Sequence, residues 1–279
     1  MLESVVNISE GKDHVFLDKL SSMSGRCLLD IHSDPYHNRS VLTLAGDDTA
    51  LMAAVQDIVL MSIEHIDISR HSGVHPRLGA VDVVPFIPLD DRGHPTKDEA
   101  AFSRATKARD EFCEWMGELG VPCFLYNDGH SLPEVRKGAF TVIMPDNGPR
   151  LPHPTAGACC VGARVALVAY NVWLNTDELV IAKSIAKSLR NDQLRTLGLA
   201  VGNMTQVSFN IIDTTAIRID DLYDSVETLA QSEGAHIAKA ELVGLLPNEC
   251  LTTIKSSRYR QLDISPERTI EKRITMLQK

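Results

Sequence analysis

The chain lacks the features that mark several large classes of protein. Aromatic residues make up only 5% of its 279 residues, so the predicted core must be built mainly from valine, isoleucine, leucine and alanine. No apolar run approaches the roughly 20 residues that a membrane-spanning helix needs. The first residues do not form a signal peptide, which favours a cytoplasmic protein with no membrane partner.

Positive charge is also scarce. Lysine and arginine number 28 against 37 aspartates and glutamates, a net charge of −9, and no long basic run occurs. Because a general nucleic-acid binder normally presents a basic face, nucleic acid is a disfavoured partner. A small anionic ligand stays compatible with this charge, since a local group of arginines focuses its field even in an acidic protein.

The six cysteines include no C-x-x-C pair. Their spacing indicates free thiols in a reducing compartment. The adjacent Cys159 and Cys160 leave a redox device open. The alternative is that both are small buried fillers of a packed turn, because free cysteine is among the most buried residue types.

The order of the predicted elements repeats along the chain. The first half reads as strands over 4–8, 27–31, 41–45 and 81–87, with helices over 13–23 and 49–66. The second half reads as strands over 165–174, 197–201, 206–212 and 240–246, with helices over 179–189 and 220–233. This doubled β-α-β-β-α-β order predicts an α+β protein of two ferredoxin-like subdomains, residues 1–165 and 166–279. We expect mainly antiparallel sheets with helices packed on one face.

Further segments are predicted outside the two repeats. Thr96 and Glu99 form a capping box that opens an amphipathic helix, whose buried face runs from Phe102 to Leu119. Residues 145–157 form a long loop without apolar periodicity, and long ordered loops in compact domains tend to be functional. Pro266 suits the first position of a C-terminal helix.

The densest group of titratable side chains lies in the segment His71-Ser-Gly-Val-His75-Pro-Arg77. Gly73 and Pro76 exclude a regular helix there. A predicted strand follows, and a stiff loop that leads into a strand is a common place for an active site. Histidine is suited to such a site because its unperturbed pKa lies near neutrality.

Two alternative roles for this segment stay open. The spacing of His71 and His75 suits zinc only if both lie on a helix, so a metal-dependent hydrolase is the less favoured alternative. In the structural alternative, His71 and Arg77 only hydrogen-bond the loop, and His75 alone or neither histidine is functional.

Other polar residues fall where this architecture brings the ends of elements together. They are Asn7, Ser9, Asp30, His32, Asn38, Arg39, Arg150, His153 and Arg164. Taken singly, each also has a possible structural role, such as a turn former for Asn7, a cap for Asn38 or a surface charge for Arg164. Their grouping favours a shared site.

Taken together, these segments resemble the glutamate formiminotransferase family, the transferase half of formiminotransferase-cyclodeaminase. The strongest match is His75-Pro-Arg-Leu-Gly-Ala-Val-Asp-Val-Val-Pro-Phe-Ile-Pro88. The other matching segments are 6–11, 28–30, 38–41, 68–71, 148–149, 153–157, 162–164, 170–174, 207–210 and 241–244. The resemblance covers nearly the whole chain. No counterpart of the cyclodeaminase half is present, so we expect formimino transfer alone.

The resemblance implies a folate-dependent transferase that moves a formimino group from N-formimino-L-glutamate to tetrahydrofolate. It also implies two ferredoxin-like subdomains, a homodimer, a cytoplasmic location and no metal. The catalytic histidine of the family's H-P-R segment falls on His75. The expected substrate- and folate-binding residues are Asn7, His32, Asn38, Arg39, Arg77, Gly148, Pro149, Arg150, Leu151, Pro152, His153, Pro154, Thr155, Ala156, Gly157 and Arg164.

The expected chemistry suits these residue types. The attacking folate nitrogen must lose a proton and the departing glutamate nitrogen must gain one, and a single histidine can do both. Arginines suit the substrates' carboxylates because the guanidinium pairs with them bidentately.

Two departures from the family pattern leave an alternative open. His32 stands where the better-characterised members carry an acidic residue, with Asp34 two positions on. The connection around 191–197 is short relative to that pattern, and Cys159 and Cys160 replace small residues. The alternative is a folate-binding homologue with a different donor or little catalytic activity.

Overall fold

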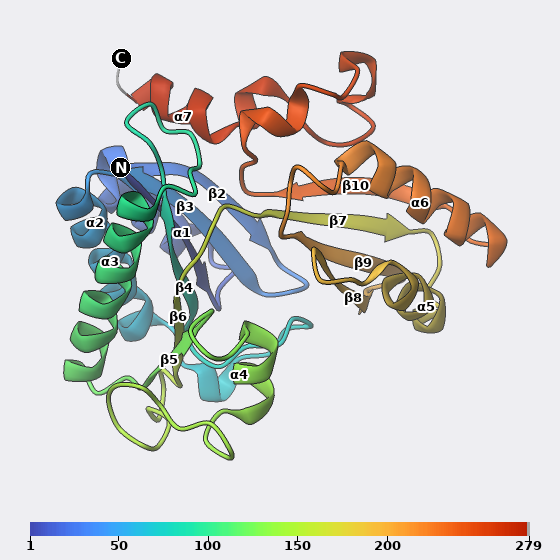
Figure 1. The fold of residues 1–279 in the computed structure, drawn as a ribbon. Helices are drawn as coiled ribbons and strands as arrows, with labels where there is room; N and C mark the ends of the chain where they lie inside the picture. Colours follow the sequence, from blue (N-terminus) through green and yellow to red (C-terminus); the bar gives the residue numbers. More distant parts are fainter. Residues whose placement is uncertain (278–279) are drawn as a thin grey trace. The chain divides into compact units, whose positions relative to one another are not determined.

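The computed structural model describes residues 1–277, which form two compact units, Met1–Val165 and a second unit that begins at Ala166 (Figure 1). Within residues 1–277, no helix is both long and apolar enough to cross a bilayer. All six cysteines are free thiols.

The first unit is built on a six-stranded sheet. Its elements are β1 (Leu2–Ile8), α1 (His14–Met23), β2 (Leu28–Asp34), β3 (Arg39–Gly46), α2 (Asp48–His65), β4 (Val81–Pro88), α3 (Glu99–Glu118), β5 (Cys123–Tyr126), α4 (Leu132–Gly138) and β6 (Cys159–Ala163). The strand order is β2-β3-β1-β4-β6-β5. The first four strands are antiparallel neighbours, which confirms the predicted ferredoxin-like arrangement. Strands β6 and β5 extend it in parallel with β4.

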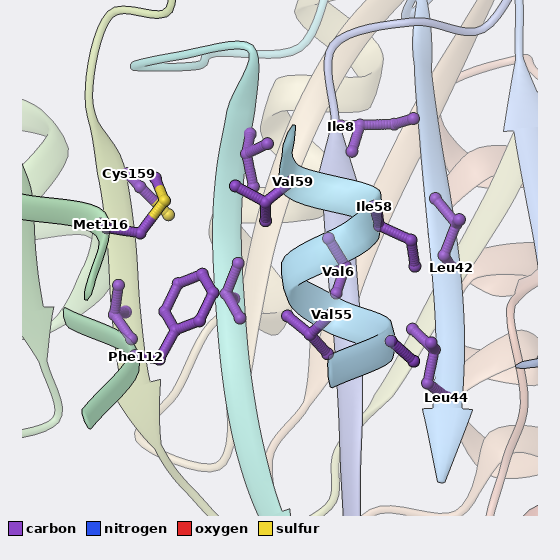
Figure 2. Close-up of a cluster of buried hydrophobic side chains, with 14 of the residues drawn as sticks. Val6, Ile8, Leu42, Leu44, Val55, Ile58, Val59, Phe112, Met116 and Cys159 are labelled. Carbon is purple, nitrogen blue, oxygen red and sulfur yellow. The ribbon is translucent and has the colours of Figure 1, made fainter. Parts of the chain in front are cut away.

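One face of this sheet carries the main apolar core. Alternate strand residues, such as Val6 and Ile8 of β1 and Leu42 and Leu44 of β3, point to this face and are buried beneath the helices. Figure 2 shows these side chains beside Val55, Ile58 and Val59 of α2, with Met116 of α3 beside Cys159 of β6. The sheet face is apolar because the strands alternate with period two, and the helices bury it.

Helix α4 covers part of the other face of the sheet. Helix α4, which the sequence pattern did not predict, packs Val135 against Phe124, Tyr126 and Cys160 on this side. Figure 1 shows α3 and α4 on opposite sides of the sheet. The helices of this unit therefore do not all lie on one face.

The second unit repeats the ferredoxin-like order with a four-stranded sheet, β10-β7-β9-β8. Its elements are β7 (Val168–Leu174), α5 (Leu179–Leu189), β8 (Leu194–Val201), β9 (Met204–Ile211), α6 (Ile219–Ser232), β10 (Ile237–Val243) and α7 (Ile270–Leu277). All neighbouring strands are antiparallel. Helices α5 and α6 bury the apolar face in a core of its own. The predicted repeat of element order is confirmed.

Three local predictions were wrong. Helix α3 begins at Glu99, and Asp98 rather than Thr96 is its cap, because the Asp98 carboxylate accepts the Ala101 N–H at 3.0 Å. Leu119 lies past the helix end and is 39% exposed. Cys159 and Cys160 are buried as expected, but they lie in strand β6 rather than in a turn.

Candidate active site

The site lies at one end of the first unit's sheet, where three segments meet. Ile8, at the end of β1, pairs with Ser40 of β3 and with Val81 of β4. The start of β3, the end of β1 and the loop that enters β4 are therefore neighbours. Ser9 fastens this loop, since its N–H donates to the Ala80 carbonyl at 2.8 Å and its hydroxyl to the Gly79 carbonyl at 2.8 Å.

Arg77 makes the contacts that hold residues 71–77, the histidine loop, in place. Its guanidinium donates to the carbonyl oxygens of His37 at 2.6 Å, Asn38 at 3.0 Å and His75 at 3.0 Å. It also lies against the ring nitrogens of His71 at 2.7 and 2.9 Å. Arg77 is thus occupied by the protein itself, as the structural alternative for this residue supposed.

Asn38 and His71 complete the loop's scaffold. Asn38 has a positive φ of 47°, and its side chain accepts the Gly11 N–H at 3.1 Å and donates to the Ser72 carbonyl at 3.1 Å. The His71 ring contacts the Asn38 carbonyl at 2.9 Å. Burial and the neighbouring Arg77 charge lower the pKa of His71. Both side chains are engaged by the protein, so neither is positioned as a free ligand.

His75 is the histidine that the loop leaves available. Its Nδ1 lies 2.8 Å from the Pro76 carbonyl oxygen, a contact that requires a proton on Nδ1. Its ring packs edge-on against His37, with centroids 6.0 Å apart. Burial first, and then the positive charges of Arg39 and Arg136, lower the pKa of His75 well below its usual range. At neutral pH the ring is therefore uncharged, and Nε2 carries the free lone pair.

A buried ion pair that the sequence pattern did not predict supports this loop. Asp82 is 1% exposed; one carboxylate oxygen accepts the Leu78 N–H at 2.7 Å, and the other pairs with Arg136 of α4. The signal was an acidic residue inside the apolar run of β4, which only a partner makes tolerable. A second signal was the capping box before α4, where Glu134 accepts the Ser131 N–H at 2.7 Å.

Arg39, by contrast, has no partner for its guanidinium. It is half-buried at the start of β3, and within residues 1–277 its side chain makes no hydrogen bond or ion pair. Burial lowers its pKa to about 10, with Arg136 and Arg77 repelling its charge and Asp82 and Asp34 attracting it. The Arg39 guanidinium is therefore available to an anionic ligand.

The predicted folate loop, 148–157, meets the histidine loop through its second half. Gly157 pairs with Gly79 and with His153, and the Ala80 N–H donates to the Ala156 carbonyl at 2.9 Å. Gly157 has a φ of +69°, and a Cβ there would collide with the Leu78 carbonyl. Tight backbone pairing therefore joins the two predicted segments.

The remaining predicted residues fall in three places. His32 pairs with Val41, which pairs with Asn7, so both polar side chains share the partly covered face with Arg39. Arg164 lies elsewhere: its N–H donates to the Phe86 carbonyl at 3.1 Å, about 16 Å along β4 from Val81 at roughly 3.3 Å per residue. Arg150 and Leu151 are exposed in the first half of the loop. The structure thus does not bring Arg164 to the histidine loop.

Comparison with known proteins gives matches along most of the chain. Residues 1–164 match the formiminotransferase domain, N-terminal subdomain, and residues 169–274 match the formiminotransferase domain. A protein of Streptococcus pyogenes serotype M1 named glutamate formimidoyltransferase is 35% identical, covering 94% of this chain and 94% of its own. One of the same name from Thermoplasma acidophilum is 33% identical, covering 94% and 93%. The formimidoyltransferase-cyclodeaminase of Sus scrofa is 33% identical, covering 90% of this chain and 51% of its own.

Proposed function

Because the chain belongs to the formiminotransferase family, we propose that it is a transferase that moves the formimino group of N-formimino-L-glutamate to tetrahydrofolate, with His75 as general acid and base. Near full-length similarity to two proteins named glutamate formimidoyltransferase supports the reaction. We further propose that residues 1–165 and 166–279 are the family's two subdomains, and that the enzyme is a cytoplasmic homodimer that needs no metal.

The observation that carries the role of His75 is its contact with the Pro76 carbonyl at 2.8 Å. With Nδ1–H donating to that oxygen, Nε2 is the atom left to handle protons. The N5 nitrogen of tetrahydrofolate attacks the formimino carbon and gives a tetrahedral centre that bears three nitrogens. His75 Nε2 takes the proton from the attacking nitrogen. It then returns the proton to the glutamate nitrogen, whose bond to carbon breaks.

The electrostatics of the loop suit this exchange. The lowered pKa of His75 keeps the ring uncharged and ready as a base at neutral pH. Once protonated beside Arg39 and Arg136, the same ring is a strong acid, which favours return of the proton to the leaving nitrogen. Arg77 and Asp82 contribute by holding the loop, and neither needs to touch a reacting atom.

The sheet face that carries α4 also carries three of the predicted substrate-binding residues. Asn7, His32 and Arg39 share that face, and the 148–157 loop borders the histidine loop through Gly157. We propose that the folate lies against this loop and that the formimino donor lies over the sheet face. Arg164 is then a contact only for the extended, carboxylate-bearing tail of folate.

The test is a transfer assay with His75→Ala. We expect formation of 5-formimino-tetrahydrofolate to fall about a hundredfold or more, since general acid–base catalysis contributes roughly 10²–10⁴ in rate. The control is Arg104→Ala, whose ion pair with Asp48 lies on the helices behind the sheet. Full activity in His75→Ala would contradict the role of His75. His32 stands where the family pattern has an acidic residue, so the folate-binding alternative also needs a test. Wild-type protein that binds folate but transfers no formimino group would select that alternative.

A further inference from the structure

Two cationic groups near His75 hold hydrogen-bond donors that the protein does not use. The Arg39 guanidinium makes no hydrogen bond or ion pair within the described chain. In Arg136, a terminal nitrogen pairs with Asp82, but Nε is buried without any partner. A buried unsatisfied donor on a charged group is costly, so a missing acceptor is the simplest account of Arg136 Nε. The half-buried Arg39 guanidinium is available to the same acceptor.

Both groups belong to the same region of the first unit. Arg39 starts β3 and faces the side of the sheet that α4 partly covers, and Arg136 is on α4. Asp82 ties Arg136 to the histidine loop through the Leu78 N–H. The charge of Arg136 lowers the pKa of Arg39, and the charges of both arginines lower the pKa of His75.

The carboxylates near Arg39 form no ion pair with it within the described residues. Asp82 uses one oxygen for Leu78 and the other for Arg136. Asp34 stands opposite Arg39 in the strand pairing, but its printed contacts are the N–H groups of Tyr36 and His37, which it accepts through one oxygen at 2.7 Å each. An anion from outside the chain would supply the contacts that Arg39 and Arg136 lack.

We propose that Arg39 and Arg136 form a receptor for the α-carboxylate of the donor amino acid, with Asp82 as the residue that positions Arg136. This inference rests on the proposed function. In N-formimino-glutamate, the α-carboxylate and the reacting nitrogen are attached to the same carbon, whereas the γ-carboxylate is two carbons further away. A receptor next to His75 therefore suits the α-carboxylate. Arg77, the other arginine of the loop, is excluded because its N–H groups already bind backbone carbonyls.

The test combines Arg39→Ala with donors that lack one carboxylate. The donors are N-formimino-L-glutamate, its α-amide and its γ-amide. In the wild type, the α-amide should lower kcat/KM by about tenfold to a hundredfold, the usual size of a charged hydrogen bond. Arg39→Ala should show the same loss with the normal donor and no further loss with the α-amide. The γ-amide should lower kcat/KM by the same factor in both proteins, and the KM for tetrahydrofolate should not change.

Controls separate the receptor from a folding defect. Arg39→Lys keeps the charge but lacks the planar pair of donors, so it should recover only part of the lost kcat/KM. Arg104→Ala removes an equal charge from the helical side of the sheet and should match the wild type with every donor. Additive losses from Arg39→Ala and the α-amide would overturn the proposal, and so would a γ-amide effect that disappears in Arg39→Ala.

A binding measurement reads the receptor without the reaction. Calorimetric titration with N-formimino-L-glutamate alone should show a dissociation constant about tenfold or more weaker in Arg39→Ala than in the wild type. Equal affinity in both proteins, or no binding at all, overturns the receptor. Binding without transfer when tetrahydrofolate is added overturns the proposed function and leaves the receptor standing.

Discussion

At the scale of the residue, two histidines four positions apart end with different chemistry. The ring of His71 is held between Arg77 and the Asn38 carbonyl, whereas His75 keeps one ring nitrogen for a substrate. Pro76 makes the difference, because its carbonyl lies 2.8 Å from Nδ1 of His75 and sets the tautomer. A single backbone contact thus distinguishes the scaffold histidine from the proposed proton carrier.

The lowered pKa of His75 predicts a pH dependence of stability. In the unfolded chain the pKa returns to about 6.5, so below that pH the unfolded state binds a proton that the native state rejects. Stability should fall as pH drops from about 6.5 toward the native pKa, with a slope of at most about 1.4 kcal/mol per pH unit from this group. Above pH 6.5 this contribution to the slope vanishes.

Denaturant unfolding of wild type and His75→Gln between pH 8 and pH 5 checks this. The free energy of unfolding of the variant should rise relative to the wild type as the pH falls. A difference that stays constant over this range would show that His75 titrates normally in the native state.

At the scale of the element, helix α4 serves the site through one ion pair. Arg136 of α4 reaches Asp82 of β4, and Asp82 in turn holds the Leu78 N–H. A seven-residue helix is thereby linked to the loop that carries His75. Asp82 orients the loop because it binds the Leu78 N–H and Arg136 at the same time. Removing either Asp82 or Arg136 would leave the charge of the other without its partner.

Asp82→Ala should therefore be strongly destabilising. We expect the free energy of unfolding to drop by about 3–5 kcal/mol, the usual cost of leaving a buried charge unpaired. The exposed pair between Arg104 and Asp48 is the matched control, and Arg104→Ala should cost at most about 1 kcal/mol. Similar losses in the two variants would contradict a buried, structural role for Asp82.

At the scale of the whole molecule, one element order is used twice with different additions. Each unit has its own sheet and its own apolar core. The first unit adds α3, β5, α4 and β6, and the candidate site lies in that unit.

Separate cores predict separable stability. Phe112→Ala, in the first core, should cost about 3–5 kcal/mol. It should also lower amide protection from hydrogen exchange mainly in the first unit. The control measurement is the protection of β7 and β9 in the second unit. An equal loss of protection in both units would mean that the chain unfolds as one cooperative body.

Much of the fold was predictable because its signals are local. The helices α2 and α3 have periodic apolar residues that specify their type and buried face, and the strands β1, β3 and β4 are short apolar segments bounded by polar or turn residues. Strand β6 has five residues and helix α4 has seven, too few to show a period. Such short elements persist because tertiary packing stabilises them, as Val135 does against Phe124.

For the site, the sequence by itself determined which residues are present. It also determined that His75 lies two positions after Gly73 and directly before Pro76, in a loop that leads into a strand. Only the tertiary structure decided which of these residues are already occupied. Arg77 binds backbone carbonyls, Arg164 lies at the far end of β4, and Arg136 reaches Asp82 from a helix that was not predicted. The physical reason is that hydrogen-bond partners and burial depend on segments far apart in the chain, which strand register brings together.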